Sequence, residues 1–484
     1  MRRRAGALNC TRCGRALAVL ALVLLPQHAW AAAALDGAAM RWPYALPFAG
    51  LLLSIALGPL LFPKLWHRHY GKIAAAWSVL ALASVAWLAG GMVTLAAFVR
   101  AILGEYFSFI VLLFSLYVVA GGILVSGDLK GTPWINTSML ALGTVMASLV
   151  GTTGAAMILV RPLIRANLKR RHNAHVVIFF IILVANVGGA LSPLGDPPLF
   201  VGFLHGVDFF WTTLNIWLQT AIVAGCLLVI FLVVDGLRFR AEPAVRISAE
   251  PATPIRIRGL VNLLLIAAII VILLLSAMWR SGIGFDIFGT RLELQSIVRN
   301  ALLLLIAALS VWLTPEEHRQ ANGFTWEPIR EVAKLFAGIF ITIIPVLAML
   351  DAGYRGAFAW LLSTLTEPGG APREVAYFWF TGLMSAFLDN APTYLLFFEL
   401  AGGDPHALMG ELSGTLASIS MGAVFMGALT YIGNAPNLMV FRIAIERGIE
   451  MPNFFGYMLR AGAVLIPLFL LLTILPISPL INWH

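Results

Sequence analysis

The chain contains the same ten-residue pattern twice, in two segments that are otherwise strongly apolar. Gly189-Ala-Leu-Ser-Pro-Leu-Gly-Asp-Pro-Pro198 returns as Gly427-Ala-Leu-Thr-Tyr-Ile-Gly-Asn-Ala-Pro436, with five of the ten positions identical. A helix in lipid can be interrupted only where the freed backbone groups face protein or a water-filled cavity. Two spans interrupted at corresponding positions of two halves are the typical sequence mark of a secondary transporter's binding site.

The composition places this repeat in a membrane. Of the 484 residues, 60% are hydrophobic and 11% are charged, and the mean hydropathy is +0.91. A membrane-spanning helix needs ~20 apolar residues. Runs of that kind lie near residues 43–63, 73–98, 104–126, 175–207, 211–234, 259–279, 293–313, 331–350, 409–441 and 455–478. Two longer runs, 134–165 and 374–401, carry breaks at mid-length, and we expect them to be re-entrant hairpins. The prediction is an all-α integral membrane protein with about ten transmembrane helices, two re-entrant hairpins and two interrupted helices.

The first 33 residues are typical of a signal peptide. A basic start precedes the apolar run 17–25, which is too short to span a bilayer, and the small residues of 29–33 supply cleavage sites. An uncleaved first anchor is the alternative. Two of the three cysteines lie in this segment and only Cys226 follows it, so neither a disulfide framework nor a zinc site is expected.

The positive charge is distributed unevenly along the chain. If both hairpins return to the side from which they enter, nineteen Lys and Arg residues fall on one side. Six fall on the other: Arg41, Arg100, Arg280, Arg291, Arg355 and Arg373. The excess marks the cytoplasmic side, which places the mature amino terminus outside, in the inner membrane of a bacterial cell. The formal charge of +9 is then a topology signal, and no nucleic-acid partner is expected.

Two features share one spacing. The interrupted segments are 427 − 189 = 238 residues apart, and the same offset relates Asp389, at the break of the second hairpin, to Gly151, at the break of the first. This spacing predicts two repeats of inverted topology, 43–234 and 259–484, joined by the basic linker 235–258.

The four breaks are predicted to meet at one depth. Half-helix amino ends would offer N–H groups to an anion, and backbone and side-chain oxygens would offer ligands to a hard cation such as Na⁺ or Li⁺. The backbone breaks are Gly151, Gly154, Gly195, Pro197, Pro392, Gly433 and Pro436. The candidate binding residues are Thr152, Thr153, Asn186, Ser192, Asn390, Thr430, Asn434 and Asn437, which could alternatively serve only to satisfy freed backbone groups.

Asp196 and Asp389 are the candidate ion-coupling carboxylates. A carboxylate at the bilayer centre costs ~2.5–3.5 kcal/mol on insertion scales, so it needs a partner or a function. Competition between Na⁺ and H⁺ for one carboxylate would exchange one ion for the other. The alternative for both residues is a simple N-cap of a half-helix.

At these residues the chain resembles the ion transporter superfamily. Asn186-Val-Gly-Gly-Ala-Leu-Ser-Pro-Leu-Gly-Asp196 and Leu388-Asp-Asn-Ala-Pro392 are similar to motifs of the NhaD-type sodium/proton antiporters and of a related branch described as citrate transport or sodium:proton antiport. The dicarboxylate carriers of the superfamily instead have Ser-Asn-Thr at both hairpin tips, from which Gly151-Thr-Thr-Gly154 departs. The resemblance implies a homodimer and an elevator-like movement of the hairpins with the broken helices.

The sequence leaves three functions open. The first is exchange of Na⁺ or Li⁺ for H⁺ across the lipid bilayer, without a bound cofactor and with no enzymatic activity. The second is cation-coupled transport of citrate or a dicarboxylate at the same site. The third, an intramembrane aspartyl protease, requires Tyr-Asp and Gly-x-Gly-Asp, whereas this chain has Leu388-Asp389 and Leu194-Gly-Asp196.

Overall fold

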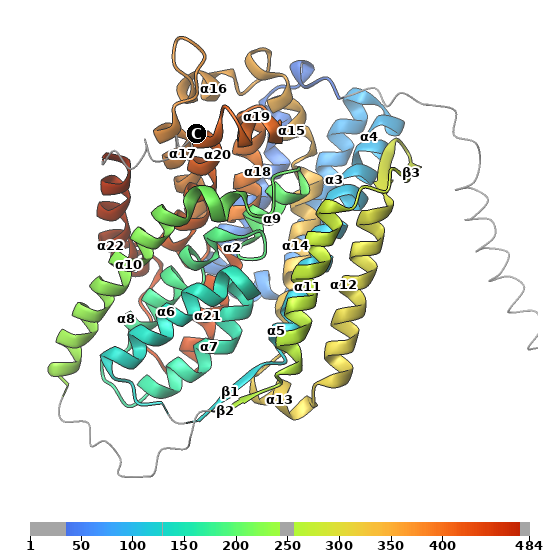
Figure 1. Ribbon diagram of the computed structural model, residues 1–484. Helices are drawn as coiled ribbons and strands as arrows, with labels where there is room; N and C mark the ends of the chain where they lie inside the picture. Colours follow the sequence, from blue (N-terminus) through green and yellow to red (C-terminus); the bar gives the residue numbers. More distant parts are fainter. Residues whose placement is uncertain (1–34, 128, 243–255, 475–484) are drawn as a thin grey trace, which may run out of the picture.

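The computed structural model describes residues 35–127, 129–242 and 256–474. The segment predicted to be a signal peptide therefore lies outside the described residues. The described chain is mostly helical, and ten of its helical stretches are long and apolar enough to cross a membrane (Figure 1). The chain is thus a multi-pass membrane protein, as its composition predicts.

The ten stretches are not identical to the ten predicted spans. They include Pro133–Val150, which is one limb of the first predicted hairpin. In the second interrupted span, Ser413–Leu429 is too short to qualify, because the break near Thr430 divides the span into two pieces.

One group of helices, which we call the frame, combines segments from both halves of the chain. In it α3 packs on α2 and α14, and α12 packs on α5 and α11. Figure 1 shows α11 and α12 side by side at one edge of the molecule. The frame consists of α2 (Leu46–Leu61), α3 (Pro63–Ala89), α4 (Gly91–Val99), the π-helix η3 (Arg100–Tyr106), α5 (Phe107–Ala120), α11 (Val261–Met278), α12 (Leu294–Leu313), α14 (Glu327–Thr342) and α15 (Ile344–Asp351).

The second group, which we call the core bundle, holds all four breaks. Its first-half members are α6 (Pro133–Val150), α7 (Thr152–Asn167), α8 (Ala174–Leu183), η4 (Val187–Leu191), α9 (Pro197–Leu204) and α10 (Trp211–Arg240). Its second-half members are α17 (Glu374–Phe387), α18 (Asn390–Leu400), α20 (Ser413–Met426), η6 (Gly427–Leu429), α21 (Ala435–Glu446) and α22 (Phe454–Ile474). The halves interlock, since α18 packs on α9 and α21 packs on α7 and α8.

Two pairs of helices form antiparallel hairpins. Asn136 near the start of α6 bonds Asn167 at the end of α7, so the limbs of hairpin 1 (α6 and α7) run in opposite directions. In hairpin 2 (α17 and α18), the Tyr377 hydroxyl donates to the Leu400 carbonyl across the limbs. Both turns lie at the predicted breaks, after Val150 and after Phe387.

Burial separates the helices that are enclosed by protein from those that are available to lipid. Of the window Ala174–Leu191, 89% is buried, compared with 22% of Val261–Met278. Both segments are strongly apolar on average, so hydropathy alone does not distinguish them, and the first is enclosed because the other helices of the core bundle surround it.

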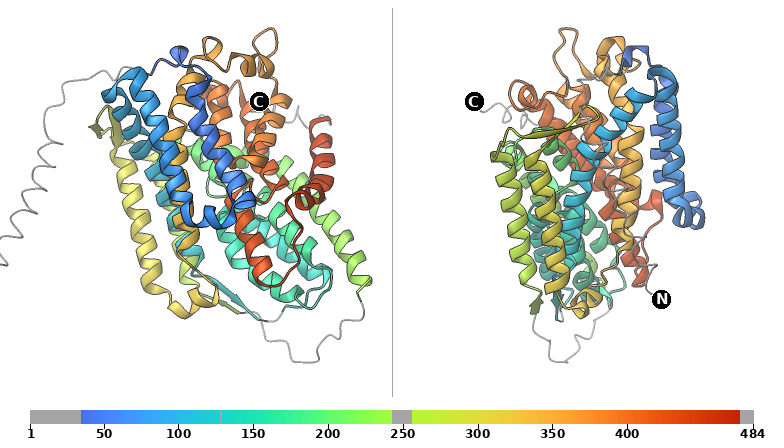
Figure 2. Two further views of the ribbon diagram at one scale, coloured as in Figure 1. Left: turned by 180° about the vertical axis from the view of Figure 1, so that it is seen from behind. Right: turned by 90° about the vertical axis from the view of Figure 1, so that its right-hand side faces the viewer.

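Short helices and strands lie at the two ends of the molecule. At one end β1 (Leu124–Ser126) pairs antiparallel with β2 (Arg256–Arg258), near α13 (Glu316–Ala321). At the other end lie the hairpin of β3 (Gly284–Ile287) and β4 (Thr290–Glu293), and α16 (Ala359–Leu365) (Figures 1 and 2). In the part of the predicted linker 235–258 that the structure describes, α10 continues to Arg240 and β2 occupies the last three residues. The remaining short elements are η1 (Gly37–Ala39), η2 (Trp42–Ala45), η5 (Gly353–Arg355) and α19 (Pro405–Met409).

Candidate functional site

The four breaks meet at one carboxylate, that of Asp196. Its side chain is 1% exposed and accepts three hydrogen bonds. Thr152 Oγ1 donates to Oδ1 at 3.1 Å, Asn434 Nδ2 donates to the same oxygen at 2.9 Å, and Asn390 Nδ2 donates to Oδ2. All three donors are uncharged and themselves buried. Asp196 is therefore the point at which the tips of both hairpins and both interrupted spans are joined.

The four residues joined by these hydrogen bonds form two pairs that are each separated by 238 positions in the sequence. Thr152 and Asn390 occupy equivalent positions in the two hairpins, since 390 − 152 = 238. Asp196 and Asn434 are also equivalent, since 434 − 196 = 238, and they are bonded to each other. Asp196 therefore bonds its own equivalent in the second copy of the motif, Asn434, and also both members of the equivalent pair Thr152 and Asn390.

Four helix amino ends surround the same carboxylate. Thr152 and Asn390 are the first residues of α7 and α18, and Asp196 and Asn434 are the N-caps of α9 and α21. Each helix amino end carries roughly half a positive charge from aligned peptide dipoles. Unsatisfied N–H groups at such ends also favour negative charge. The three side chains that donate to Asp196 are uncharged. The helix amino ends therefore make the site suitable for anionic groups although no Lys or Arg among the described residues donates to Asp196.

A second set of bonds holds the interrupted segments in place. Asn186 Nδ2 donates to Asn437 Oδ1 at 2.7 Å, and Asn434 Nδ2 also reaches the Ala185 carbonyl at 3.1 Å. Ser192 Oγ donates to the Ser148 carbonyl, and its repeat equivalent Thr430 donates to Ala386. Ser192 and Thr430 therefore satisfy backbone carbonyls of the hairpins, which is the structural alternative considered for them.

Two buried amide oxygens at the site have no hydrogen-bond partner. They are Oδ1 of Asn186 and Oδ1 of Asn390, and both residues are 0% exposed. A buried acceptor without a donor costs ~1–3 kcal/mol. Both oxygens have the chemistry of ligands for a hard cation, and Asn390 also donates to the Asp196 carboxylate through its Nδ2.

Asp389 differs from Asp196. It is the N-cap of α18, its Oδ1 accepts from the Ala391 N–H at 3.3 Å, and its side chain is only half-buried. Asp196 makes no such capping bond although it precedes α9. The capping alternative therefore describes the contacts of Asp389 and not those of Asp196.

The remaining predicted residues shape the breaks. A Cβ at Gly195 would lie 2.2 Å from the Gly189 carbonyl oxygen, and one at Gly433 would lie 2.6 Å from that of Gly427. Gly151 has φ +83°, a conformation that favours glycine. Pro197, Pro392 and Pro436 stand in the first turns of their helices, Gly154 packs on Ala120, and Thr153 is partly exposed beside Thr152.

Sequence reasoning missed a buried ionic cluster at the base of hairpin 1. Asp235 of α10 is 0% exposed and accepts from Arg170 at 2.5 Å, from His175 at 2.8 Å and from Asn136 at 3.0 Å. Asn167 bonds both Asn136 and Arg170. The cluster, which we call the clasp, fastens both limbs of hairpin 1 to α8 and α10. The available signal is an acid directly after the apolar run 211–234, whereas the predicted linker begins at residue 235.

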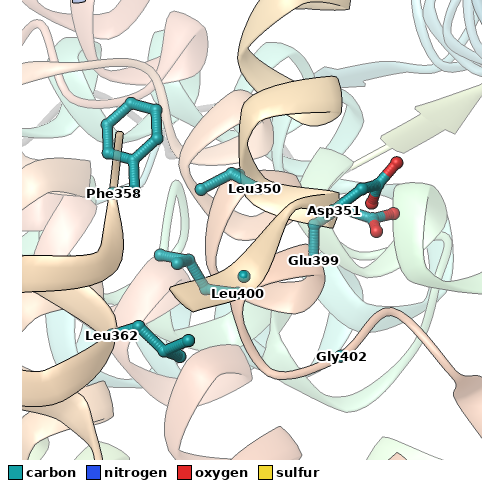
Figure 3. Close-up of a pocket in the computed structure, with 8 residues that line it drawn as sticks. Leu350, Asp351, Phe358, Leu362, Glu399, Leu400 and Gly402 are labelled. Carbon is teal, nitrogen blue, oxygen red and sulfur yellow. The ribbon is translucent and has the colours of Figure 1, made fainter. Parts of the chain in front are cut away.

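A cavity of about 240 Å³ opens at the opposite end, between the frame and hairpin 2 (Figure 3). Asp351 of α15 and Glu399 of α18 line one wall, and the other wall is apolar, with Leu350, Phe358, Leu362 and Leu400. A much smaller apolar cavity of about 10 Å³ lies between α14 and the tip of hairpin 2. Among the described residues, no group of three or more His, Cys, Asp or Glu side chains could hold a metal ion.

Comparison with known proteins extends over almost the whole chain. A family model described as "Putative citrate transport" matches residues 37–477. Two curated proteins, uncharacterized transporters of Mycobacterium tuberculosis and Mycobacterium bovis, are each 23% identical over 343 residues. That alignment covers 69% of this chain and 74% of each relative.

Proposed function

Because the chain belongs to the "Putative citrate transport" family, which makes it a secondary transporter rather than an enzyme, we propose that it carries citrate or a related carboxylate together with a small cation or protons. The observation that supports this cargo is the arrangement of four helix amino ends around Asp196. Amino ends attract carboxylate groups, whereas the carboxylate of Asp196 requires a positive partner. A site that needs both charges is suited to an anion that travels with a cation.

Asp196 has the coupling role in this proposal. A bound cation or proton neutralises it, and the hairpin tips respond because Thr152 and Asn390 both bond to its oxygens. The unpartnered oxygens of Asn186 and Asn390 are the further ligands available to a cation. Neutralisation matters because a charged carboxylate is costly to move through the low-dielectric region of the membrane.

Exchange of Na⁺ or Li⁺ for H⁺ is the second candidate, and one observation favours it. The cavity beside the tip of hairpin 2 has a volume of about 10 Å³ and is lined by apolar side chains, so it has room for little more than a water molecule. Binding of a proton or a small cation at the Asp196 carboxylate needs no larger space, whereas a carboxylate cargo requires the tips to separate.

The proposal includes a topology and an assembly. The 238-residue equivalence of Asp196 and Asn434, and the excess of Lys and Arg on one side, support inverted repeats with re-entrant hairpins and a cytoplasmic end at β1, β2 and α13. A bacterial inner-membrane location, an outside amino terminus and a homodimer complete the proposal, the homodimer resting on the family resemblance.

Transport by proteoliposomes distinguishes the two candidates. Labelled citrate is added outside with an inward gradient of Na⁺, of Mg²⁺ or of protons, and internal pH is followed in parallel with NaCl, LiCl or KCl and no citrate. Gradient-dependent citrate uptake that is lost in Asp196→Asn supports the carboxylate carrier. Cation-dependent pH change without citrate, also lost in that variant, supports the exchanger. If neither occurs in vesicles that contain folded protein, both proposals are wrong.

A further inference from the structure

Two arginines of hairpin 1 hold the frame at the cytoplasmic end. Arg161 of α7 donates from Nη1 to the Asn322 carbonyl and from Nη2 to the Gly323 carbonyl, the latter at 3.3 Å. One turn further, Arg165 donates to the Val125 carbonyl of β1 at 3.1 Å. Both residues belong to the core bundle, whereas the acceptors lie in segments next to helices of the frame: Val125 in β1, shortly after α5, and Asn322 and Gly323 in the loop between α13 and α14. These bonds therefore cross the seam along which the two groups of helices meet.

The acceptors for Arg161 are fixed in place. The Asn322 side chain donates to the carbonyls of Gly121 and Ile123, which ties the loop after α13 to the end of α5. Arg319 donates to the Val118 carbonyl at 2.8 Å and to the Ser310 carbonyl at 2.9 Å. The loop is therefore expected to move with the frame. The carbonyls of Asn322 and Gly323 are held in position to accept from the guanidinium of Arg161.

The fit at Gly323 is specific. A Cβ at this residue would lie 2.2 Å from Arg161 Nη2, so a side chain there would displace the guanidinium. The backbone of Gly323 has φ +59°, which also favours glycine. A planar guanidinium with two parallel N–H groups matches two neighbouring carbonyls in a way that a lysine ammonium does not.

The seam and the clasp differ in how easily they can open. In the clasp Asp235 is 0% exposed and Arg170 is 5% exposed, so separating them would leave charges buried without partners. Arg161 is only half-buried and Arg165 is exposed, so water can replace their carbonyl acceptors. When hairpin 1 moves, it therefore moves with α8 and α10 and parts from the frame.

We propose that Arg161 is a latch that holds the core bundle at the cytoplasmic end of the frame and that releases the carbonyls of Asn322 and Gly323 in every transport cycle. The proposal rests on the function proposed above only in requiring that the protein is a carrier, and the cargo does not matter to it. The strength of these hydrogen bonds sets the fraction of molecules in which the core bundle is held against the frame at the cytoplasmic end.

Cross-linking across the seam tests the latch. Val125→Cys and Arg165→Cys are introduced in a background with Cys10, Cys13 and Cys226 replaced by serine, and a short reversible bis-methanethiosulfonate joins them. The Arg165 side chain spans the gap, with its Nη2 3.1 Å from the Val125 carbonyl, so a reagent about as long as that side chain bridges the two positions. We expect the cross-link to stop transport and a thiol reductant to restore it. Unchanged turnover of the cross-linked protein would overturn the proposal.

The yield of the cross-link measures the latch directly and does not depend on transport. Arg161→Gln is expected to lower the yield on the order of tenfold, which corresponds to the loss of one hydrogen bond from a charged group at the weak end of its usual range. Gly323→Ala should lower it similarly, and Arg161→Lys should give an intermediate value. Arg240→Gln, which removes an exposed positive charge from the last turn of α10, is the matched control.

The two proposals fail in distinguishable ways. If no cargo is transported but Arg161→Gln still lowers the yield relative to Arg240→Gln, the latch stands and the assigned cargo is wrong. If both variants give the same yield while the protein is folded by size-exclusion chromatography, Arg161 does not hold the seam and the latch is rejected.

Discussion

Asp196 and Asn434 are separated by 238 residues and joined by a hydrogen bond of 2.9 Å. The same number of residues separates the two copies of the interrupted motif. The two repeats therefore meet at a pair of equivalent residues, of which one has become an acid and the other an amide. This one difference places a single carboxylate between the two copies of the motif.

The bond between these two residues predicts the outcome of a swap. Asp196→Asn should reduce coupled transport to the level of empty liposomes, because no carboxylate remains at the point where the tips meet. Adding Asn434→Asp moves the carboxylate to the equivalent position and should recover part of the activity. Initial rates of both variants at matched protein density are the measurement. An inactive double variant would show that the local surroundings of the two positions are not interchangeable.

Asp389 allows its charge to be separated from its capping role. Asn caps a helix about as well as Asp, so Asp389→Asn should leave the melting temperature unchanged, whereas Asp389→Ala should cost ~0.5–2 kcal/mol of stability. If Asp389 couples ions, the Asn variant nevertheless loses transport. Full activity of Asp389→Asn would reduce the residue to the N-cap that its contact with Ala391 describes.

The paired glycines predict a structural cost in both repeats. Gly195→Ala and Gly433→Ala would press a methyl group against the carbonyls of Gly189 and Gly427, at 2.2 and 2.6 Å. Each should destabilise the protein by ~1–3 kcal/mol, as overpacking does. Gly225→Ala is the control, because nothing lies within 4 Å of its Cβ and alanine favours the helix. Thermal unfolding in detergent should rank the three, and equal melting temperatures would contradict the close approach.

The clasp predicts a large loss from a nearly isosteric change. Asp235→Asn removes the partner of the buried Arg170 and should destabilise the protein by ~3–5 kcal/mol. Glu242→Gln, at an exposed acid that accepts from the backbone N–H groups of Arg171 and His172, should change stability much less. Urea or thermal unfolding of the two variants gives the comparison. Similar stabilities would mean that the clasp is dispensable.

Most of the fold follows from local sequence properties. Apolar runs locate the helices, and the breaks after Val150 and Phe387 fall where Gly151 and Asp389-Asn-Ala-Pro392 interrupt them. The start of α3 at Pro63 could not be read from hydropathy, since its first turns carry Lys64, His67, Arg68 and His69. These residues extend the helix beyond the apolar core of a membrane, where polar side chains are accommodated.

By itself, the sequence determined that this is a multi-pass helical protein, that it carries the same motif twice at a spacing of 238 residues, and which residues stand at the four breaks. Those properties can be read along the chain from composition and motif spacing, without knowledge of how the helices pack. Only the tertiary structure decided that Thr152, Asn390 and Asn434 all converge on Asp196, that Asp389 caps a helix, and that Asp235 and Arg161 hold hairpin 1 to different neighbours. Hydrogen bonds between residues as far apart as 238 positions depend on how helices pack against one another, and hydropathy carries no information about which face of a helix meets which partner.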